Sequence, residues 1–133
     1  MNLIEEINLP NGLKLTITDF SRRIAADTIK IELVYQMKVP LSESFFASRE
    51  DYQTVVNAFG PVMTYEHKME RTFVRYREET SVRDELLTTF KQNKMNYLAS
   101  PNFAKKLALS TLREIKLNPF KHQPKPSVPE TDD

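Results

Sequence analysis

His67 and the glutamates beside it are the residues of this chain best suited to catalysis. Glu66 precedes the imidazole and Glu70 follows it closely in the sequence. An imidazole near carboxylates is typical of general acid–base catalysis, in which a side chain moves a proton to or from a reacting group. On an extended strand, Glu66, Lys68 and Glu70 would share one face and His67 would point to the other. The pattern therefore favours a solvated ladder of charges and a structural histidine over a proton-transfer site.

The same segment carries part of a zinc-binding pattern. The first four positions of the inverted zinc-peptidase pattern H-x-x-E-H are met by His67-Lys68-Met69-Glu70. The fifth position is Arg71, whose cation would repel a metal ion where the pattern needs a second imidazole. The first hairpin of pitrilysin-type metallopeptidases, whose zinc helix carries this pattern, is similar to Leu9-Pro10-Asn11-Gly12-Leu13-Lys14. The resemblance implies a zinc peptidase, but the sequence lacks the full ligand set, so we predict no metal site.

The composition excludes most other recognisable chemistry. The 133 residues include no cysteine, two histidines and two glycines. Disulfides and thiolate ligands are therefore absent, and no serine or threonine lies in a Gly-x-Ser-x-Gly nucleophile turn. Gly12 and Gly60 both mark the ends of elements, which leaves no glycine to form a phosphate-binding loop. We expect a protein without catalytic residues or cofactor, with an enzyme of unrecognised type around His67 as an alternative.

Basic residues give the one electrostatic indication of a partner. Residues 80–117 hold seven basic and three acidic side chains, a net charge of +4 in a chain whose total is +1. Basic and aromatic residues also alternate from Arg71 to Arg77, which faintly resembles the stacking strand of RNA-recognition motifs without their glycines. An alternative function is therefore a nucleic-acid-associated regulator. Its phosphate contacts would come from Arg71, Arg75, Lys91, Lys94, Lys105 and Lys106.

The first element that the sequence predicts is a β-hairpin. Apolar residues at positions 7, 9, 13, 15 and 17 alternate around Pro10-Asn11-Gly12. A three-residue loop places Ile7 opposite Leu15 and Asn8 opposite Lys14, whereas a two-residue loop would pair apolar with polar side chains on both faces. Proline at the first turn position and glycine in the left-handed position suit the three-residue loop. We therefore predict that loop and its register.

Further elements follow from periodicity and capping residues. Residues 19–27 are charged and predict a connection, and the alternation over residues 29–39 predicts a long strand with one wet face. Ser48 is a candidate N-cap for a helix that Gly60-Pro61 ends. Ser81 resembles the start of a capping box for a helix that runs to about Ala99, and Ser100-Pro101 resembles the start of the last helix.

Residues 62–79 admit two predictions. Tyr65, Met69, Phe73 and Tyr76 suit a helix, whereas the run from Thr72 to Tyr76 suits a strand. We favour the strand, because the other amphipathic strands need partners to form a sheet of useful size. In that interpretation Met63, Tyr65, Met69 and Phe73 share the inward face, together with His67 and Arg71.

These elements predict an α+β fold. We expect an antiparallel sheet of about four strands with three helices on one face, in the order β-β-β-α-β-α-α. Residues 1–117 would form a single domain, and residues 118–133 a disordered proline-rich tail. No apolar run approaches the ~18 residues of a membrane span, so we expect a cytoplasmic protein with no membrane partner. We expect it to bind a protein partner or, through an open sheet edge, a second copy of itself in a homodimer.

Overall fold

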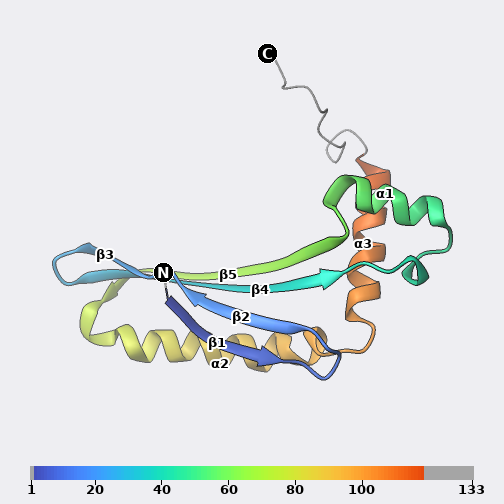
Figure 1. Cartoon of the computed structure of the whole chain (residues 1–133). Coiled ribbons are helices and arrows are strands. Elements are labelled where there is room, and N and C mark those ends of the chain that lie inside the picture. The colour runs from blue at the N-terminus through green and yellow to red at the C-terminus, as the bar shows by residue number, and fades with distance from the viewer. Residues whose placement is uncertain (1, 119–133) are drawn as a thin grey trace, which may run out of the picture. The chain divides into compact units, whose positions relative to one another are not determined.

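The computed structural model describes residues 2–118. Within that range the chain forms five strands and three α-helices (Figure 1). The strands are β1 (Asn2–Asn8), β2 (Lys14–Asp19), β3 (Arg22–Ala25), β4 (Thr28–Pro40) and β5 (Val62–Arg75). The helices are α1 (Arg49–Phe59), α2 (Glu79–Leu98) and α3 (Phe103–Leu117), with short 3-10 turns η1 (Glu43–Phe45) and η2 (Tyr76–Glu78). The predicted tail, residues 118–133, lies outside the described residues except for Asn118.

The described chain divides into two compact units. The first contains residues 2–39 and 64–103, and the second contains residues 40–63 and 104–118. The α+β class, the antiparallel sheet and the three helices are confirmed, and the sheet has five strands where four were predicted. The additional strand is β3, which lies in the segment predicted to be a charged connection.

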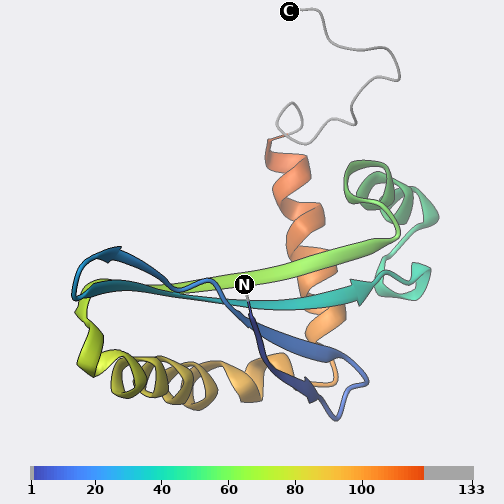
Figure 2. The same cartoon turned by 60° about the vertical axis from the view of Figure 1, so that its left-hand side comes forward.

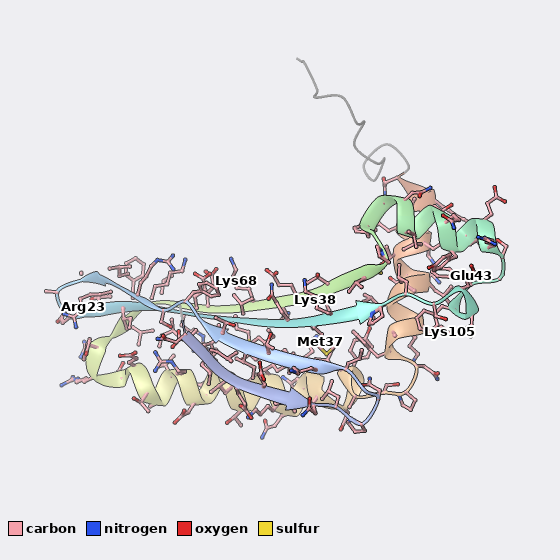
Figure 3. All side chains as sticks on the ribbon, in the orientation of Figure 1. Arg23, Met37, Lys38, Glu43, Lys68 and Lys105 are labelled. Atoms are coloured by element: carbon pink, nitrogen blue, oxygen red, sulfur yellow. The ribbon has the colours of Figure 1, made fainter. Side chains whose placement is uncertain are left out.

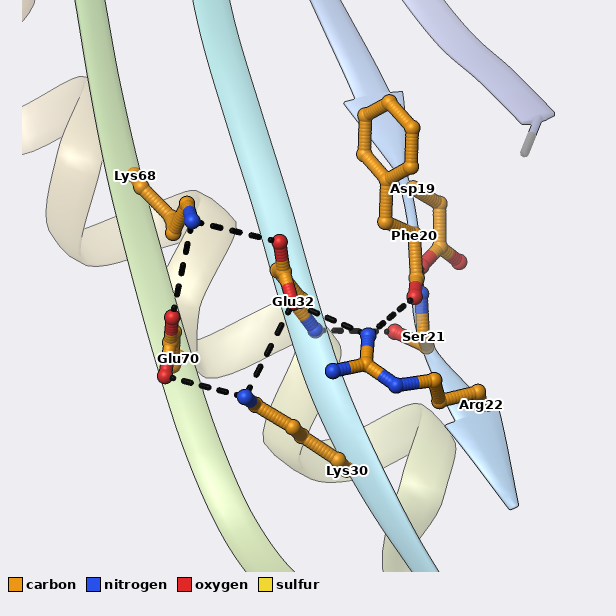
Figure 4. Close-up of polar contacts among 8 residues, drawn as sticks. All are labelled: Asp19, Phe20, Ser21, Arg22, Lys30, Glu32, Lys68 and Glu70. Atoms are coloured by element: carbon orange, nitrogen blue, oxygen red, sulfur yellow. Dashed lines mark hydrogen bonds and ion pairs between the residues drawn. The ribbon is translucent and has the colours of Figure 1, made fainter. Parts of the chain in front are cut away.

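The sheet is organised around β4. On one side, β2 pairs antiparallel with residues 33–37 of β4 and β3 pairs antiparallel with residues 28–30. On the other side lies β5. Lys30 of β4 contacts Glu70 of β5 (Figure 4), and Lys38 contacts Thr64, so β5 runs antiparallel to β4. β1 pairs only with β2 among the described strands. The order is therefore β1-β2-β4-β3, with β5 on the far side of β4.

The first hairpin has the predicted loop and register. Ile7 faces Leu15 and Asn8 faces Lys14, and the backbone N–H of Leu9 donates to the carbonyl of Leu13 at 2.8 Å. Gly12 has the left-handed φ of 89° that this loop requires. The alternation of side chains and the turn residues thus favour the same pairing, which is why the sequence predicts it correctly.

The first unit buries one face of the sheet against α2. Figures 1 and 2 show this helix running along the sheet. The rings of Tyr35 on β4 and Phe90 on α2 stack with centroids 3.6 Å apart. Figure 3 shows the opposite orientations of neighbouring β4 side chains, with Met37 on the helix side and Lys38 on the other. The buried residues of β2, β4 and α2 that form this core are Leu15, Ile17, Ile29, Ile31, Leu33, Tyr35, Met37, Val39, Leu86, Phe90 and Leu98.

The helix α2 begins before the predicted capping box. It follows η2 directly and starts at Glu79 instead of Ser81, without a side-chain hydrogen bond at its N-cap. The backbone N–H of Tyr76 donates to the carbonyl of Asp27 at 2.8 Å, and this tertiary contact fixes the chain where the helical turns begin. Tyr97 near the end of α2 is half exposed, and its ring is perpendicular to that of Phe103 with centroids 5.2 Å apart.

The second unit contains α1 and residues 104–117 of α3. The predicted cap of α1 is confirmed, because the Ser48 hydroxyl accepts a hydrogen bond from the backbone N–H of Asp51 at 3.1 Å. Gly60 ends the helix with a φ of 85°, in the left-handed region that favours glycine. Lys116 on α3 lies 3.3 Å from the Asp51 carboxylate on α1. This ion pair links α1 and α3 within the second unit, and Val55 on α1 is fully buried.

Candidate binding site at the end of the sheet

The segment for which the sequence allowed either a helix or a strand forms the strand β5. The alternation of buried and exposed side chains along β5 does not continue through Phe73. Met63, Tyr65, His67 and Met69 are buried or half-buried at odd positions, but beyond them the buried residue is Val74. Phe73 has a left-handed φ of 58° and is 80% exposed. The prediction that Phe73 faces inward was therefore wrong. A single left-handed residue shifts the alternation by one position and turns the phenyl ring into solvent.

The turn between β3 and β4 meets the end of β5. The guanidinium carbon of Arg23 lies 4.5 Å from the centroid of the Tyr76 ring, and Arg23 also donates to the Ala26 carbonyl at 3.2 Å. Together with the hydrogen bond from Tyr76 to Asp27, these contacts join the hairpin turn to the start of η2. Figure 3 shows Arg23 at this end of the sheet. The contacts hold the Tyr76 ring in place, although it remains 51% exposed.

A shallow depression opens at the same junction. Its volume is about 480 Å³, and its lining residues are Asp27, Arg75, Tyr76 and Arg77. No carboxylate lies within ion-pair distance of Arg23, Arg75 or Arg77 among residues 2–118. We call Arg23, Phe73, Arg75, Tyr76 and Arg77 the arginine–aromatic site. It combines exposed rings with guanidinium groups whose hydrogen-bonding capacity is largely unused.

The outer face of the sheet carries a second cluster, which is internally neutralised. Glu32 on β4 lies 3.0 Å from Arg22 and 3.5 Å from Lys68, and Glu70 lies 3.4 Å from Lys30 (Figure 4). The hydrogen bond from Arg22 is the largest influence on the pKa of the Glu32 carboxyl and lowers it. Burial opposes this to a smaller extent, and the charge of Lys68 lowers the pKa further. Because each charge has an opposite neighbour, this cluster joins β3, β4 and β5 through ion pairs.

The group predicted for acid–base catalysis is split between the two faces of β5. The Glu66 carboxylate accepts a hydrogen bond from the Gln36 side-chain amide at 2.8 Å on the outer face, where Glu70 contacts Lys30 and Lys68. His67 lies on the other face, with its ring centroid 5.7 Å from that of Phe90 and 6.2 Å from that of Tyr35. The strand therefore does not bring the imidazole and the two carboxylates together.

The incomplete zinc pattern is also divided by the strand. His67 and Glu70 stand an odd number of positions apart, which on a strand directs them to opposite faces, whereas the peptidase pattern requires a helix. Within residues 2–118, no group of three or more histidine, aspartate or glutamate side chains is arranged to hold a metal ion. In the same range, no helix is long and apolar enough to cross a membrane.

The residues predicted to contact nucleic acid have different surroundings. In the first unit, Lys91 forms a 2.9 Å ion pair with Glu5 on β1, and Arg71 lies 3.9 Å from Glu85 on α2. Lys94 is exposed on α2 and has no ion-pair partner among the described residues. In the second unit, Lys105 and Lys106 are exposed on α3, and Figure 3 marks Lys105. Arg75 is the one predicted residue that lines the depression of the arginine–aromatic site.

A partial signal for this site is present in the sequence, but one of its members has no such signal. The alternation from Arg71 to Arg77 includes Phe73, Arg75, Tyr76 and Arg77, so the composition of the β5 end was visible. Arg23 lies far away in the sequence and joins the site only through the pairing of β3 with β4. Comparison of the chain with protein-family models, curated proteins and solved structures finds no match. Any functional inference therefore starts from the geometry of the site.

Proposed function

We propose that this chain is a small, non-catalytic, cytoplasmic protein-interaction domain that binds a protein partner through the arginine–aromatic site. The observation that supports this most directly is Phe73, a large apolar side chain that is 80% exposed on left-handed backbone. Such backbone is unfavourable for a phenylalanine, and the exposed ring adds nothing to the core. If a partner binds the ring, the exposed position of Phe73 has a function. Aromatic and arginine side chains are also the types enriched at the centres of protein interfaces.

The local charges favour a protein over a polyanion as the partner. Arg23, Arg75 and Arg77 have no ion-pair partner in the described part of the chain, but the exposed acids Asp27 and Glu78 lie on the same two segments. The excess of positive charge is therefore small. Binding to a phosphate backbone depends on several uncompensated cations, whereas a protein surface of mixed charge suits a site of this composition.

A nucleic-acid-associated role is the second candidate. The observation that favours it is that the exposed ring of Tyr76 lies between Arg75 and Arg77 in the sequence, with exposed Phe73 two residues before Arg75. Bases stack on exposed rings, and neighbouring guanidinium groups bind phosphates. The exposed lysines Lys94, Lys105 and Lys106 would extend such a surface only weakly, because Lys91 is already paired with Glu5.

The test is an affinity pull-down from a lysate of the cells that make the protein, read by mass spectrometry. The bait is the full-length chain, and half of each sample is treated with nuclease. A second bait carries Phe73→Ala, Arg75→Ala and Arg77→Ala. A matched control bait carries Leu3→Ala and Lys14→Ala, which remove an exposed apolar side chain and an exposed cation from the first hairpin.

The proposal predicts a protein that survives nuclease and is lost only with the triple variant. Loss of every partner on nuclease treatment would support the nucleic-acid role instead. Partners retained equally by all three baits would exclude the arginine–aromatic site as the contact surface.

A further inference from the structure

The outer edge of β5 is open. β5 contains 14 residues and pairs with β4 alone among the described strands. Its second row of backbone N–H and carbonyl groups therefore has no strand partner within residues 2–118. Open edges of this length invite pairing with another strand unless the sequence opposes it.

We propose that β5 pairs antiparallel with β5 of a second copy of this chain, with the two-fold axis at His67. Two identical antiparallel strands that keep their faces aligned must have a residue of the strand at the axis. β5 has no left-handed residue from Val62 to Thr72, the strand residues before Phe73, and His67 is the midpoint of that stretch. An axis at His67 therefore pairs the greatest length of regular strand.

The charges on the outer face agree with this register. With the axis at His67, Glu66 of each copy stands opposite Lys68 of the other, so the interface contains the same favourable pair twice. An axis at Lys68 would place Lys68 against itself and Glu66 against Glu70, and an axis at Glu66 would place Glu66 against itself. Both of these registers bring like charges together and are disfavoured.

The side chains on the inner face favour an axis at His67 over an axis at Met69. An axis at Met69 would also pair Lys68 with Glu70, but it would place His67 opposite Arg71 and leave part of the regular strand unpaired. With the axis at His67, Tyr65 of each copy stands opposite Met69 of the other. Both side chains are half-buried in the monomer, and a thioether beside an aromatic ring is a favourable contact.

The side chains at the proposed interface have capacity for a second contact. Glu66 uses one carboxylate oxygen, Oε1, to accept from Gln36, which leaves the other oxygen available. Lys68 lies 3.5 Å from Glu32 and 3.8 Å from Glu70 and is still 48% exposed. An ammonium group has three donors, so Lys68 can contact a further carboxylate across the interface.

A charge-swap experiment on the full chain tests this register. Oligomeric state is measured by analytical ultracentrifugation across the micromolar range for the wild type, Glu66→Lys, Lys68→Glu, the double variant and an equimolar mixture of the two single variants. Circular dichroism shows whether each variant is folded. Asp84→Lys and Lys94→Glu reverse exposed charges on α2 that have no ion-pair partner within residues 2–118, and they serve as matched controls.

We expect dimers for the wild type and both controls, and a dissociation constant raised by ~10-fold or more for each single variant, because each places like charges together twice. The double variant and the mixture should both recover the dimer, since opposite charges then face each other again. A monomeric wild type would overturn the proposal. It would equally be overturned by single variants that dimerise normally or by a mixture that stays monomeric. Rescue of Lys68→Glu by Glu70→Lys in place of Glu66→Lys would assign the axis to Met69 and contradict His67.

Discussion

The guanidinium carbon of Arg23 lies 4.5 Å from the centroid of the Tyr76 ring. This contact joins a hairpin turn to the end of β5, and the hydrogen bond from the Tyr76 N–H to the Asp27 carbonyl joins the same segments. A cation over an aromatic ring stabilises both side chains in one arrangement. The arginine–aromatic site is thus partly ordered before a partner arrives, which lowers the entropy that binding must offset.

The left-handed backbone at Phe73 predicts an unusual order of stability among its variants. Phe73→Gly should have a higher free energy of unfolding than Phe73→Ala by about 1 kcal/mol, because only glycine adopts positive φ without steric cost. Urea unfolding of the two variants measures this difference. At Thr72, which has no left-handed φ, the same pair of substitutions should rank in the opposite order. An alanine variant at position 73 as stable as the glycine variant would contradict the conformation described.

Removal of the Tyr35 hydroxyl should leave the free energy of unfolding at neutral pH unchanged or raise it by up to about 1 kcal/mol. The reason is that this buried oxygen has no hydrogen-bond partner in the described part of the chain, while its ring remains stacked on Phe90 in Tyr35→Phe. Tyr35→Ala should instead destabilise strongly, because it removes the ring from the core. Thermal unfolding of the two variants beside the wild type distinguishes these effects. A large loss of stability in Tyr35→Phe would show that the hydroxyl is bonded.

Alkaline pH should destabilise the wild type more than Tyr35→Phe. Burial raises the pKa of Tyr35 from 10.0 to about 12. The unfolded chain therefore loses this proton first, and stability falls between pH 10 and 12 with a slope of at most about 1.4 kcal/mol per pH unit. The pKa of Tyr65 is raised as well, by burial and by Tyr97, so the stability of Tyr35→Phe should still fall at alkaline pH, but less than that of the wild type. Urea midpoints that fall equally in both proteins would contradict this account.

Asn11→Asp should destabilise the first unit by about 1–3 kcal/mol. The Asn11 side-chain amide donates to the carbonyls of Leu98 at 2.8 Å and Ser100 at 2.9 Å, which ties the first hairpin to the end of α2. A carboxylate has no donor there and would face the negative end of the helix dipole. Asn8→Asp, at an exposed position of β1, is the matched control for the added charge. Equal unfolding midpoints for the two variants would show that the amide contacts contribute nothing.

Glu32→Gln should make the free energy of unfolding fall less steeply as the pH is lowered into the acid range. The folded pKa of Glu32 is lowered below its value of 4.5, chiefly by the hydrogen bond from Arg22. Its contribution is therefore present above pH 4.5 and is lost as the pH falls through the folded pKa. At neutral pH the substitution should cost no more than about 1 kcal/mol, since the cluster is close to solvent. Glu50→Gln, an exposed position on α1, should leave this acid-range fall unchanged when chemical unfolding is followed from pH 3 to 6.

The parts of the fold that the sequence predicts well are those fixed by local patterns. The register of the first hairpin follows from alternation around Pro10-Asn11-Gly12, and the cap of α1 follows from Ser48. β3 escaped prediction because all four of its residues are exposed, so it has no alternation between buried and exposed positions. Backbone pairing with β4 forms this strand, and backbone pairing leaves little trace in the sequence.

The candidate site was harder to predict for two physical reasons. The outward orientation of Phe73 depends on one backbone angle, and the residue type gives no indication of it, since phenylalanine rarely adopts positive φ. The contact of Arg23 with Tyr76 depends on strand pairing between distant segments. Side-chain composition alone indicated an arginine-rich and aromatic segment, but neither its exposed ring nor its non-local partner.

Site-specific photo-crosslinking in living cells tests the central claim most directly. A photoreactive phenylalanine derivative replaces Phe73 in one protein and Lys94, which is exposed on α2, in the control. If the arginine–aromatic site binds a protein, illumination should give a distinct protein adduct from position 73 that is absent from position 94. No adduct from position 73, or the same adducts from both positions, would contradict the proposal that this site is the surface through which the chain binds its partner.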